Sequence, residues 1–210
     1  MMPMTAAVRA RIQYYGRKVW HTLFGLRVTG AERVPRKGGV IIACNHISEL
    51  DPPVLGCAVP RTVAFMAKME LFGKRFSAYF LEKLNTFPVN RSGVDTGAIR
   101  LALDLLNRGE AVVIFPEGTR SRDGRLLPVK AGVGLVAASA GVPVLPAFIW
   151  GTDEAGPAFT RRGRNFSVTF GKIMPSETIS MIKAERGGRA VAEEIMSAIE
   201  KTGREAGLYV

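Results

Sequence analysis

The segment Val40-Ile41-Ile42-Ala43-Cys44-Asn45-His46-Ile47-Ser48-Glu49-Leu50-Asp51 joins an unbroken apolar run to a polar one. The apolar part is rich in β-branched residues and follows Lys37-Gly38-Gly39, which predicts a buried strand over 40–44. Asn45 and His46 would then lie just past the carboxyl end of this strand. Open α/β sheets bind their ligands at that end, so the segment predicts a functional site as well as a strand.

The spacing of His46 and Asp51 has a chemical meaning only if a loop joins them. On one continuous helix, residues five apart point about 140° away from each other. Asp51-Pro52-Pro53 is typical of a helix start, which predicts Asp51 at the N-cap of a helix that follows the loop. A carboxylate there could hold the imidazole N–H and stabilise the imidazolium that forms on proton uptake. The alternative is an ordinary loop histidine beside a capping aspartate.

The rest of the chain alternates short apolar runs with helical patterns. We predict further strands at 62–67, 86–89, 111–115, 144–150 and 166–170, and helices over 5–25, from Pro52, over 95–107 and 131–140, and around Val191, Ile195 and Ile199. This alternation predicts an α/β fold with a largely parallel central sheet flanked by helices. We expect residues 1–28 to form an amphipathic membrane-interface helix and residues 29–210 a single α/β domain.

The net charge of +11 arises from 29 basic and 18 acidic side chains. Residues 1–40 hold eight Lys or Arg against Glu32 alone, which makes this segment +7. Such a chain could bind an anionic membrane surface, a phosphorylated substrate or nucleic acid. Because no nucleic-acid-binding motif is present, we expect no nucleic-acid partner.

The two cysteines, Cys44 and Cys57, lie in apolar surroundings without metal-ligand spacing. They favour a reduced, cytosolic setting and no metal site. A reactive Cys44 paired with His46 is the less favoured interpretation, and buried packing is the more favoured one.

The N-terminal segment carries Val8, Ile12, Tyr15, Val19 and Leu23 at helical spacing, with basic residues outside this stripe. The pattern suits a helix in the membrane interface, and its alternative is a helix packed on the protein's own core. The segment 71–84 allows the same two interpretations. The longest uncharged stretch, 131–151, is interrupted by glycines and prolines, so we expect neither a transmembrane span nor a signal peptide.

A second polar loop, Pro116-Glu117-Gly118-Thr119-Arg120-Ser121, follows the strand predicted at 111–115. If the strands are neighbours in a parallel sheet, His46, Arg91 and this loop all leave the same edge. Gly118 could let backbone N–H groups approach an anion, and Arg120 and Arg91 have the fork geometry that suits phosphate. We interpret Glu117 as orienting an arginine or a substrate hydroxyl. The alternative is a solvated surface loop.

Four stretches in this order resemble the sequence blocks of the glycerophospholipid acyltransferases, specifically the PlsC-like 1-acylglycerol-3-phosphate acyltransferases. They are Asn45-His46 with Asp51, 87–91, 115–121 and 142–146. The resemblance implies transfer of an acyl chain from a CoA or acyl-carrier-protein thioester to the 2-hydroxyl of 1-acylglycerol-3-phosphate. It implies His46 as general base and Asp51 as its partner.

The same resemblance implies that Arg91, Glu117, Gly118, Thr119 and Arg120 hold the acceptor and its phosphate. Lys68, which follows a predicted strand, is a candidate for the oxyanion or a phosphate. Neither a cofactor nor a metal is implied, since the acyl thioester is itself a substrate.

Other functions fit parts of the pattern. The same chemistry could act on another lysolipid such as a lyso-ornithine lipid, water could replace the acceptor in a thioesterase, or the chain could be a non-catalytic basic membrane-surface module. The expected location is peripheral or monotopic on the cytoplasmic face of the cell membrane. The sequence leaves open the donor, the acyl chain length and the oligomeric state.

Overall fold

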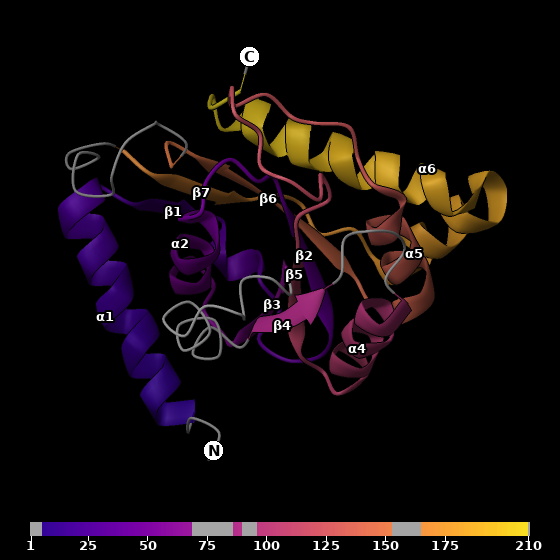
Figure 1. The fold of residues 1–210 in the computed structure, drawn as a ribbon, viewed down its shortest axis with the longest axis horizontal. Coiled ribbons are helices and arrows are strands. Elements are labelled where there is room, and N and C mark those ends of the chain that lie inside the picture. Colours follow the sequence, from indigo (N-terminus) through magenta and orange to yellow (C-terminus); the bar gives the residue numbers. More distant parts are fainter. Residues whose placement is uncertain (1–5, 69–85, 90–95, 153–164, 210) are drawn as a thin grey trace.

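The chain folds around a seven-stranded sheet in the order β1-β7-β6-β2-β5-β3-β4 (Figure 1). The computed structural model describes residues 6–68, 86–89, 96–152 and 165–209. The strands are β1 (Arg27–Thr29), β2 (Val40–Cys44), β3 (Val63–Lys68), β4 (Thr86–Val89), β5 (Ala111–Ile114), β6 (Val144–Trp150) and β7 (Ser167–Phe170). The helices are α1 (Ala6–Phe24), the short η1 (Ala31–Arg33), α2 (Asp51–Ala58), α4 (Thr96–Asn107), α5 (Ala131–Ala140) and α6 (Ser176–Glu205).

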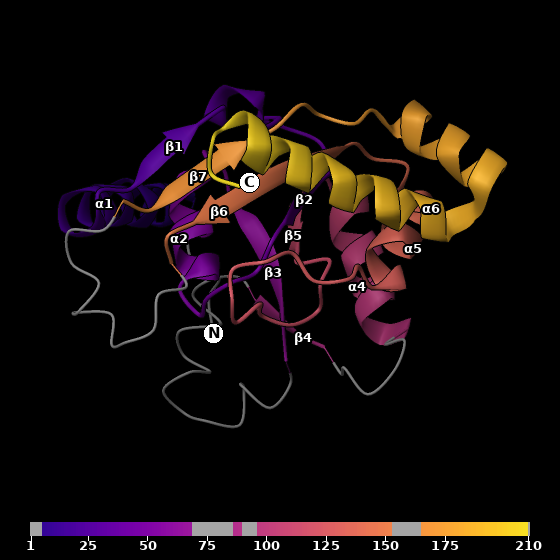
Figure 2. The ribbon, with the colours of Figure 1, turned by 90° about the horizontal axis from the view of Figure 1, so that it is seen from above.

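Strand β2 lies at the centre of the sheet, between β6 and β5, and pairs with both in parallel. Ile42 is level with Val113 of β5 and with Leu145 of β6. Strands β3 and β4 continue the parallel order beyond β5. Only β7 and β1 run the other way among the described strands, since β7 pairs with β6 antiparallel and β1 with β7 in parallel. Figure 2 shows these two strands beside β6 at one end of the sheet. The predicted largely parallel α/β fold is confirmed.

Helices cover both faces of the sheet, and the side chains of β2 pack against both helical layers. Val40, Ile42 and Cys44 belong to the hydrophobic cluster that includes residues of α2, whereas Ile41 and Ala43 belong to the cluster with α4, α5 and α6. All five side chains are completely buried. An apolar run without polar alternation is what a strand needs when both of its faces are covered.

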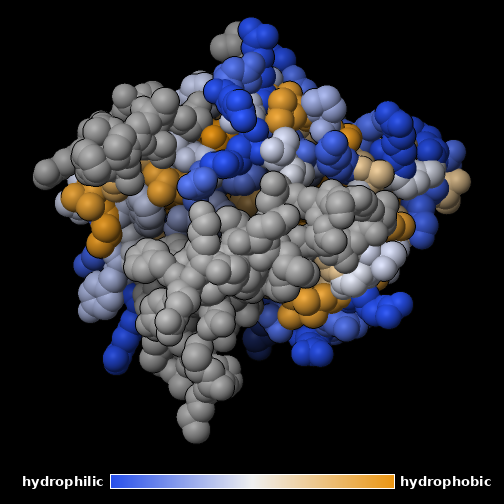
Figure 3. Space-filling model, viewed as in Figure 1, coloured by the Kyte–Doolittle hydropathy of each residue, from blue (hydrophilic) through white to orange (hydrophobic). Residues whose placement is uncertain are grey.

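Helix α1 has one face on the protein and another face open. Phe24 stacks on Phe166 with ring centroids 5.0 Å apart, and the Gln13 amide donates to the carbonyl oxygens of Gly56 and Arg61. On the open face Tyr14, Tyr15, Val19 and Leu23 are the exposed large apolar side chains. Figure 3 shows hydrophobic and hydrophilic surface together on the side where α1 runs in Figure 1. The helix expected over 5–25 is therefore present, and its place at a membrane stays a prediction.

Several expectations fall outside the description or differ from it. Strand β1 and helix η1 were not predicted, because each has only three residues. Arg91 and the segment 71–84 lie outside the described residues. Both interpretations of that segment therefore stay predictions. Over the described ranges, no helix combines the length and apolar character needed to cross a bilayer.

Candidate active site

Two loops leave the carboxyl ends of the neighbouring strands β2 and β5, and hydrogen bonds that involve both backbone groups of His46 join them. The His46 N–H donates to Oε1 of Glu117 at 2.8 Å, and the Ser121 N–H donates to the His46 carbonyl oxygen at 2.8 Å. His46 and the 116–121 loop, far apart in the sequence, are thus held side by side. The structure brings these predicted site residues together at one edge of the sheet.

The imidazole of His46 forms a close pair with Asp51. Its Nδ1 lies 2.7 Å from Oδ2 of Asp51, and the Phe115 ring stacks on the imidazole with centroids 4.2 Å apart. Asp51 is 0 % exposed and His46 is 9 % exposed. A carboxylate can only accept hydrogen bonds, so Nδ1 carries the proton and Nε2 is the basic nitrogen. This arrangement can accept a proton at Nε2 while the carboxylate stabilises the resulting imidazolium.

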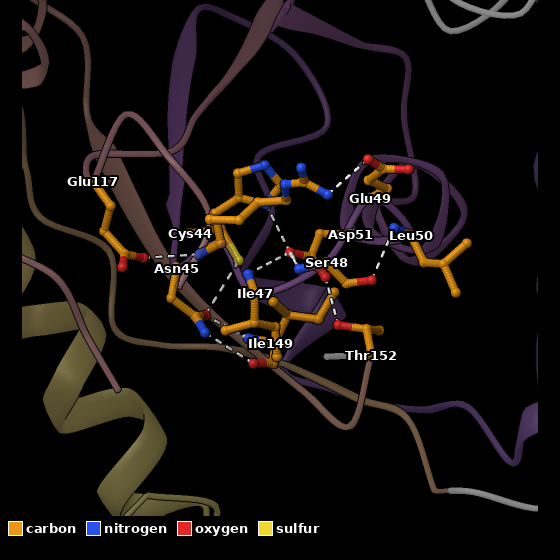
Figure 4. Close-up of polar contacts among 12 residues, drawn as sticks. Cys44, Asn45, Ile47, Ser48, Glu49, Leu50, Asp51, Glu117, Ile149 and Thr152 are labelled. Carbon is orange, nitrogen blue, oxygen red and sulfur yellow. Dashed lines mark hydrogen bonds and ion pairs between the residues drawn. The ribbon is translucent and has the colours of Figure 1, made fainter. Parts of the chain in front are cut away.

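The Asp51 carboxylate is surrounded by donors (Figure 4). Its Oδ2 accepts the N–H groups of Ile47 and Ser48, at 2.7 and 2.8 Å, in addition to Nδ1 of His46. Its Oδ1 accepts the hydroxyl of Thr152 at 2.5 Å. Charge-assisted bonds of this kind offset the desolvation of a buried carboxylate.

The predicted N-cap role of Asp51 is wrong. Asp51 is the first residue of α2, Leu50 occupies the cap position, and no side chain caps the helix. The physical reason is in the sequence, because Pro52 and Pro53 have no N–H to offer in the first turn. The Asp51 carboxylate turns back instead to the loop that precedes it, where amide donors are present.

Asn45 ties the active-site loop to β6. Its side-chain amide donates to the Ile149 carbonyl oxygen at 3.0 Å and its Oδ1 accepts the Ile149 N–H at 2.8 Å. The side chain thus continues the β2–β6 ladder by one position beyond the end of β2. Sequence reasoning placed Asn45 at the strand end but gave it no role.

Glu117 has a different environment from the one predicted. It is buried, and its second oxygen, Oε2, accepts the Leu127 N–H at 2.8 Å, while Oε1 accepts the His46 N–H. It therefore orients two backbone amides, and its predicted contact with an arginine or a substrate hydroxyl stays a prediction. Burial raises the pKa of the Glu117 carboxyl, although these two amide hydrogen bonds oppose the rise.

The remaining residues of the second loop face outward to different extents. Gly118 turns the chain at φ 68°, and its N–H donates to the Phe115 carbonyl oxygen at 3.0 Å. That amide is engaged within the turn, and the predicted approach of backbone N–H groups to an anion at Gly118 stays a prediction. Thr119 and Arg120 are exposed, and Nη1 of Arg120 bonds to Oε1 of Glu49 at 2.7 Å. Arg120 therefore bridges the two loops.

The other candidates are placed only in part. Lys68 is the last residue of β3, which pairs with β5 in parallel, so its backbone reaches the same edge as His46. Its side chain and all of Arg91 lie outside the described residues. Cys44 is fully buried, as expected, and burial raises the pKa of its thiol. Within the described ranges, no three His, Cys, Asp or Glu side chains are grouped to hold a metal ion.

Thr152 was missed by sequence reasoning. It is 0 % exposed, lies two residues beyond the end of β6 and contacts Asp51. Its position past a buried strand, at the edge where His46 emerges, is a signal that could have drawn attention to it.

The fold and site define an α/β protein with a buried histidine–aspartate pair at the carboxyl edge of a largely parallel sheet. Residues 25–150 match the family model described as Acyltransferase. The chain belongs to the acyltransferase family, and the PlsC-like character that its motifs indicated is confirmed.

Relatives and a solved structure support this assignment. The chain is 34 % identical over 138 residues to a 1-acyl-sn-glycerol-3-phosphate acyltransferase of Bacillus subtilis, covering 65 % of this chain and 68 % of that protein. It is 31 % identical over 138 residues to the protein of that name from Borreliella burgdorferi, covering 65 % of this chain and 55 % of the relative. The crystal structure of the 1-acyl-sn-glycerophosphate (LPA) acyltransferase PlsC from Thermotoga maritima is 29 % identical, with a TM-score of 0.71, covering 92 % of this chain and 79 % of the other.

The raised pKa of Glu117 predicts a pH-dependent contribution to stability. The pKa of this carboxyl is higher in the folded state than in the unfolded chain, where it has its ordinary value of 4.5. Its contribution to stability is therefore complete below pH 4.5 and is lost as the pH rises through the folded-state pKa. The free energy of unfolding of the wild type should therefore fall relative to that of Glu117→Gln as the pH rises above about 4.5. Urea unfolding of both proteins at several pH values measures this difference.

Asp123→Asn is the control, because the contribution of Asp123 to stability should change with pH in the opposite direction. The exposed Asp123 carboxylate accepts the N–H of Arg125 and the hydroxyl of Ser121, which lower its pKa, so its stabilisation is lost as the pH falls. A difference between wild type and Glu117→Gln that does not change with pH would contradict the assigned environment of Glu117.

Proposed function

We propose that this protein transfers an acyl chain from a thioester to the 2-hydroxyl of 1-acylglycerol-3-phosphate, giving phosphatidic acid. The observation that carries the proposal is the buried His46–Asp51 pair at 2.7 Å, joined by backbone bonds to a loop that bears Arg120. The Bacillus subtilis and Borreliella burgdorferi relatives are 1-acyl-sn-glycerol-3-phosphate acyltransferases, and in such a reaction His46 would be the base and Arg120 the cation.

The reaction has the substrate alcohol as its nucleophile. The acceptor's 2-hydroxyl oxygen attacks the thioester carbonyl carbon while its proton passes to Nε2 of His46, and Asp51 stabilises the imidazolium. The tetrahedral intermediate then expels the thiolate by breaking the C–S bond, and the imidazolium can return the proton to sulfur. General-base assistance contributes about 10²–10⁴ to the rate, so substrate positioning must supply much of the rest.

Arg120 is the described side chain best placed to bind the acceptor's phosphate. Its guanidinium is half-exposed and bonds to the more exposed carboxylate of Glu49, which a phosphate of higher charge could replace. Arg91 and Lys68 remain candidates for the same phosphate or for the oxyanion, on the ground of their sequence positions. The carbonyl chemistry is the same for a CoA thioester and for an acyl-carrier-protein thioester, and it calls on no cofactor.

Replacing His46 by Ala should lower kcat by about 10²–10⁴, because no base would then take the proton. Asp51→Asn should also lower kcat while leaving the protein folded, since an amide oxygen can still accept the N–H groups of Ile47 and Ser48. His21→Ala is the matched control, because His21 lies on α1 and its Nδ1 contacts only the nearby Leu26 carbonyl oxygen in the described structure.

A radiolabelled thioester offered with lysophosphatidate measures the transfer for all four proteins. Near-wild-type phosphatidate formation by His46→Ala would refute the assigned base. Release of free fatty acid in place of phosphatidate would identify a thioesterase instead.

Replacing Arg120 by Ala should raise KM for lysophosphatidate about tenfold, because one charge-assisted contact to phosphate is lost. The control is Arg122→Ala, which removes an exposed positive charge from the same loop. Lyso-ornithine lipid, which has no phosphate, serves as the comparison acceptor. The KM for this lipid should be the same in the wild type and in Arg120→Ala. Equal KM values for lysophosphatidate in the wild type and Arg120→Ala would place the phosphate elsewhere.

We further propose that α1 lies on the membrane, with the described fold below it and its active-site edge open to lipid. Tyr15, Val19 and Leu23 recur at helical spacing on its open face and are 62 %, 51 % and 37 % exposed. Lys18, whose ammonium lies 4.6 Å from the Tyr14 ring centroid, adds positive charge near this stripe. An apolar face with flanking cations is suited to the interface of an anionic bilayer.

The triple substitution Tyr15→Gln, Val19→Gln and Leu23→Gln should weaken sedimentation with phosphatidylglycerol vesicles by at least about tenfold, because each apolar side chain contributes to insertion. These positions are exposed, so the fold is retained, unlike in a deletion that would remove the buried Phe24. Met181→Gln on α6, where the side chain is 62 % exposed, is the control. Unchanged vesicle binding by the triple variant would contradict the interfacial helix.

A further inference from the structure

The end of β6 is shaped so that the chain turns toward Asp51. Strand β6 ends at Trp150, and Gly151 follows with φ 83°, in the left-handed region. A Cβ at Gly151 would lie 2.9 Å from the Asn165 carbonyl oxygen, so both the backbone angle and the available space require glycine here. This turn places Thr152 in the interior, with 0 % of its surface exposed.

Thr152 contacts Oδ1 of Asp51, whereas Oδ2 accepts three donors from the loop that precedes α2. Oδ2 of Asp51 accepts His46 Nδ1 and the N–H groups of Ile47 and Ser48. Oδ1 accepts the Thr152 hydroxyl, which must be the donor because a carboxylate cannot donate. Figure 4 shows Thr152 and Asp51 facing each other from different segments of the chain.

The two oxygens of Asp51 are thus fixed from two directions. The terminal torsion of an aspartate is broad, so bonds to one oxygen alone leave the plane of the carboxylate poorly defined. The plane determines the direction from which Oδ2 meets the ring N–H of His46. A donor on Oδ1, supplied by the segment that follows β6, sets that plane.

We propose that Thr152 is a positioning residue of the catalytic pair: its hydroxyl orients the Asp51 carboxylate, which in turn holds the His46 imidazole for proton uptake. Asn45 supports the same arrangement, because it bonds both backbone groups of Ile149 and so fixes the β6 end to the active-site loop. This inference rests on the proposed acyl transfer, because that reaction is its readout.

The test compares Thr152→Ser, which keeps the hydroxyl, with Thr152→Ala, which lacks only that oxygen relative to serine. Thr152→Ala should lower kcat about tenfold with little change in KM for lysophosphatidate, and Thr152→Ser should retain most of the wild-type kcat. Thr202→Ala is the matched control, since Thr202 is also buried and its hydroxyl donates to the Ala198 carbonyl oxygen on α6. If thermal unfolding shows that Thr152→Ala does not fold, the isosteric Thr152→Val replaces it.

A double-mutant cycle with Asp51→Asn shows whether Thr152 acts through Asp51. If it does, adding Thr152→Ala to Asp51→Asn should lower kcat by less than twofold, whereas a general packing defect would lower it again by the full factor. Independent effects in the cycle, or equal kcat values for Thr152→Ser and Thr152→Ala, would overturn the proposal. A wild type that transfers no acyl chain, or a fully active His46→Ala, would instead refute the proposed function.

Discussion

The buried carboxylate of Asp51 is the constraint on which the site depends. An ionised carboxylate without partners would be strongly unfavourable in the interior, so its burial requires donors that point inward. The structure supplies them from the imidazole of His46, from the loop amides of Ile47 and Ser48, and from the hydroxyl of Thr152. Satisfying one charge therefore shapes the loop after β2, orients the His46 imidazole and ties the segment after β6 to the start of α2.

The parallel pairing of β2 and β5 places the second loop beside the first. Because the two strands run in the same direction, both loops leave at one edge, and Glu117 and Ser121 bond to opposite ends of the His46 backbone. His46 is consequently held by its main chain as well as by its ring. The half-exposed Arg120 extends from this support and pairs with Glu49 of the first loop.

The strands other than β1, and the largely parallel character of the sheet, were predictable from the sequence because apolar β-branched runs separated by helical patterns allow few other packings. The closeness of His46 to the 116–121 loop followed from the same reasoning. The hydrogen-bond partners of the individual side chains did not follow from the sequence. Asp51 was expected to cap a helix, but the prolines after it offer no amide. The two backbone N–H groups that Glu117 accepts were not anticipated, because they come from His46 and Leu127 at other points of the chain.

By itself the sequence determined which groups the site contains: an imidazole, a carboxylate five residues later and an arginine-bearing loop at the end of another strand. It also determined the sheet, since residue spacing controls which side chains face a core. The tertiary structure alone decided that the hydroxyl of Thr152, 101 residues from Asp51, donates a hydrogen bond to that carboxylate. It also decided which face of α1 stays exposed. Hydrogen-bond partners depend on distances of about 3 Å in space, which separation along a chain does not specify.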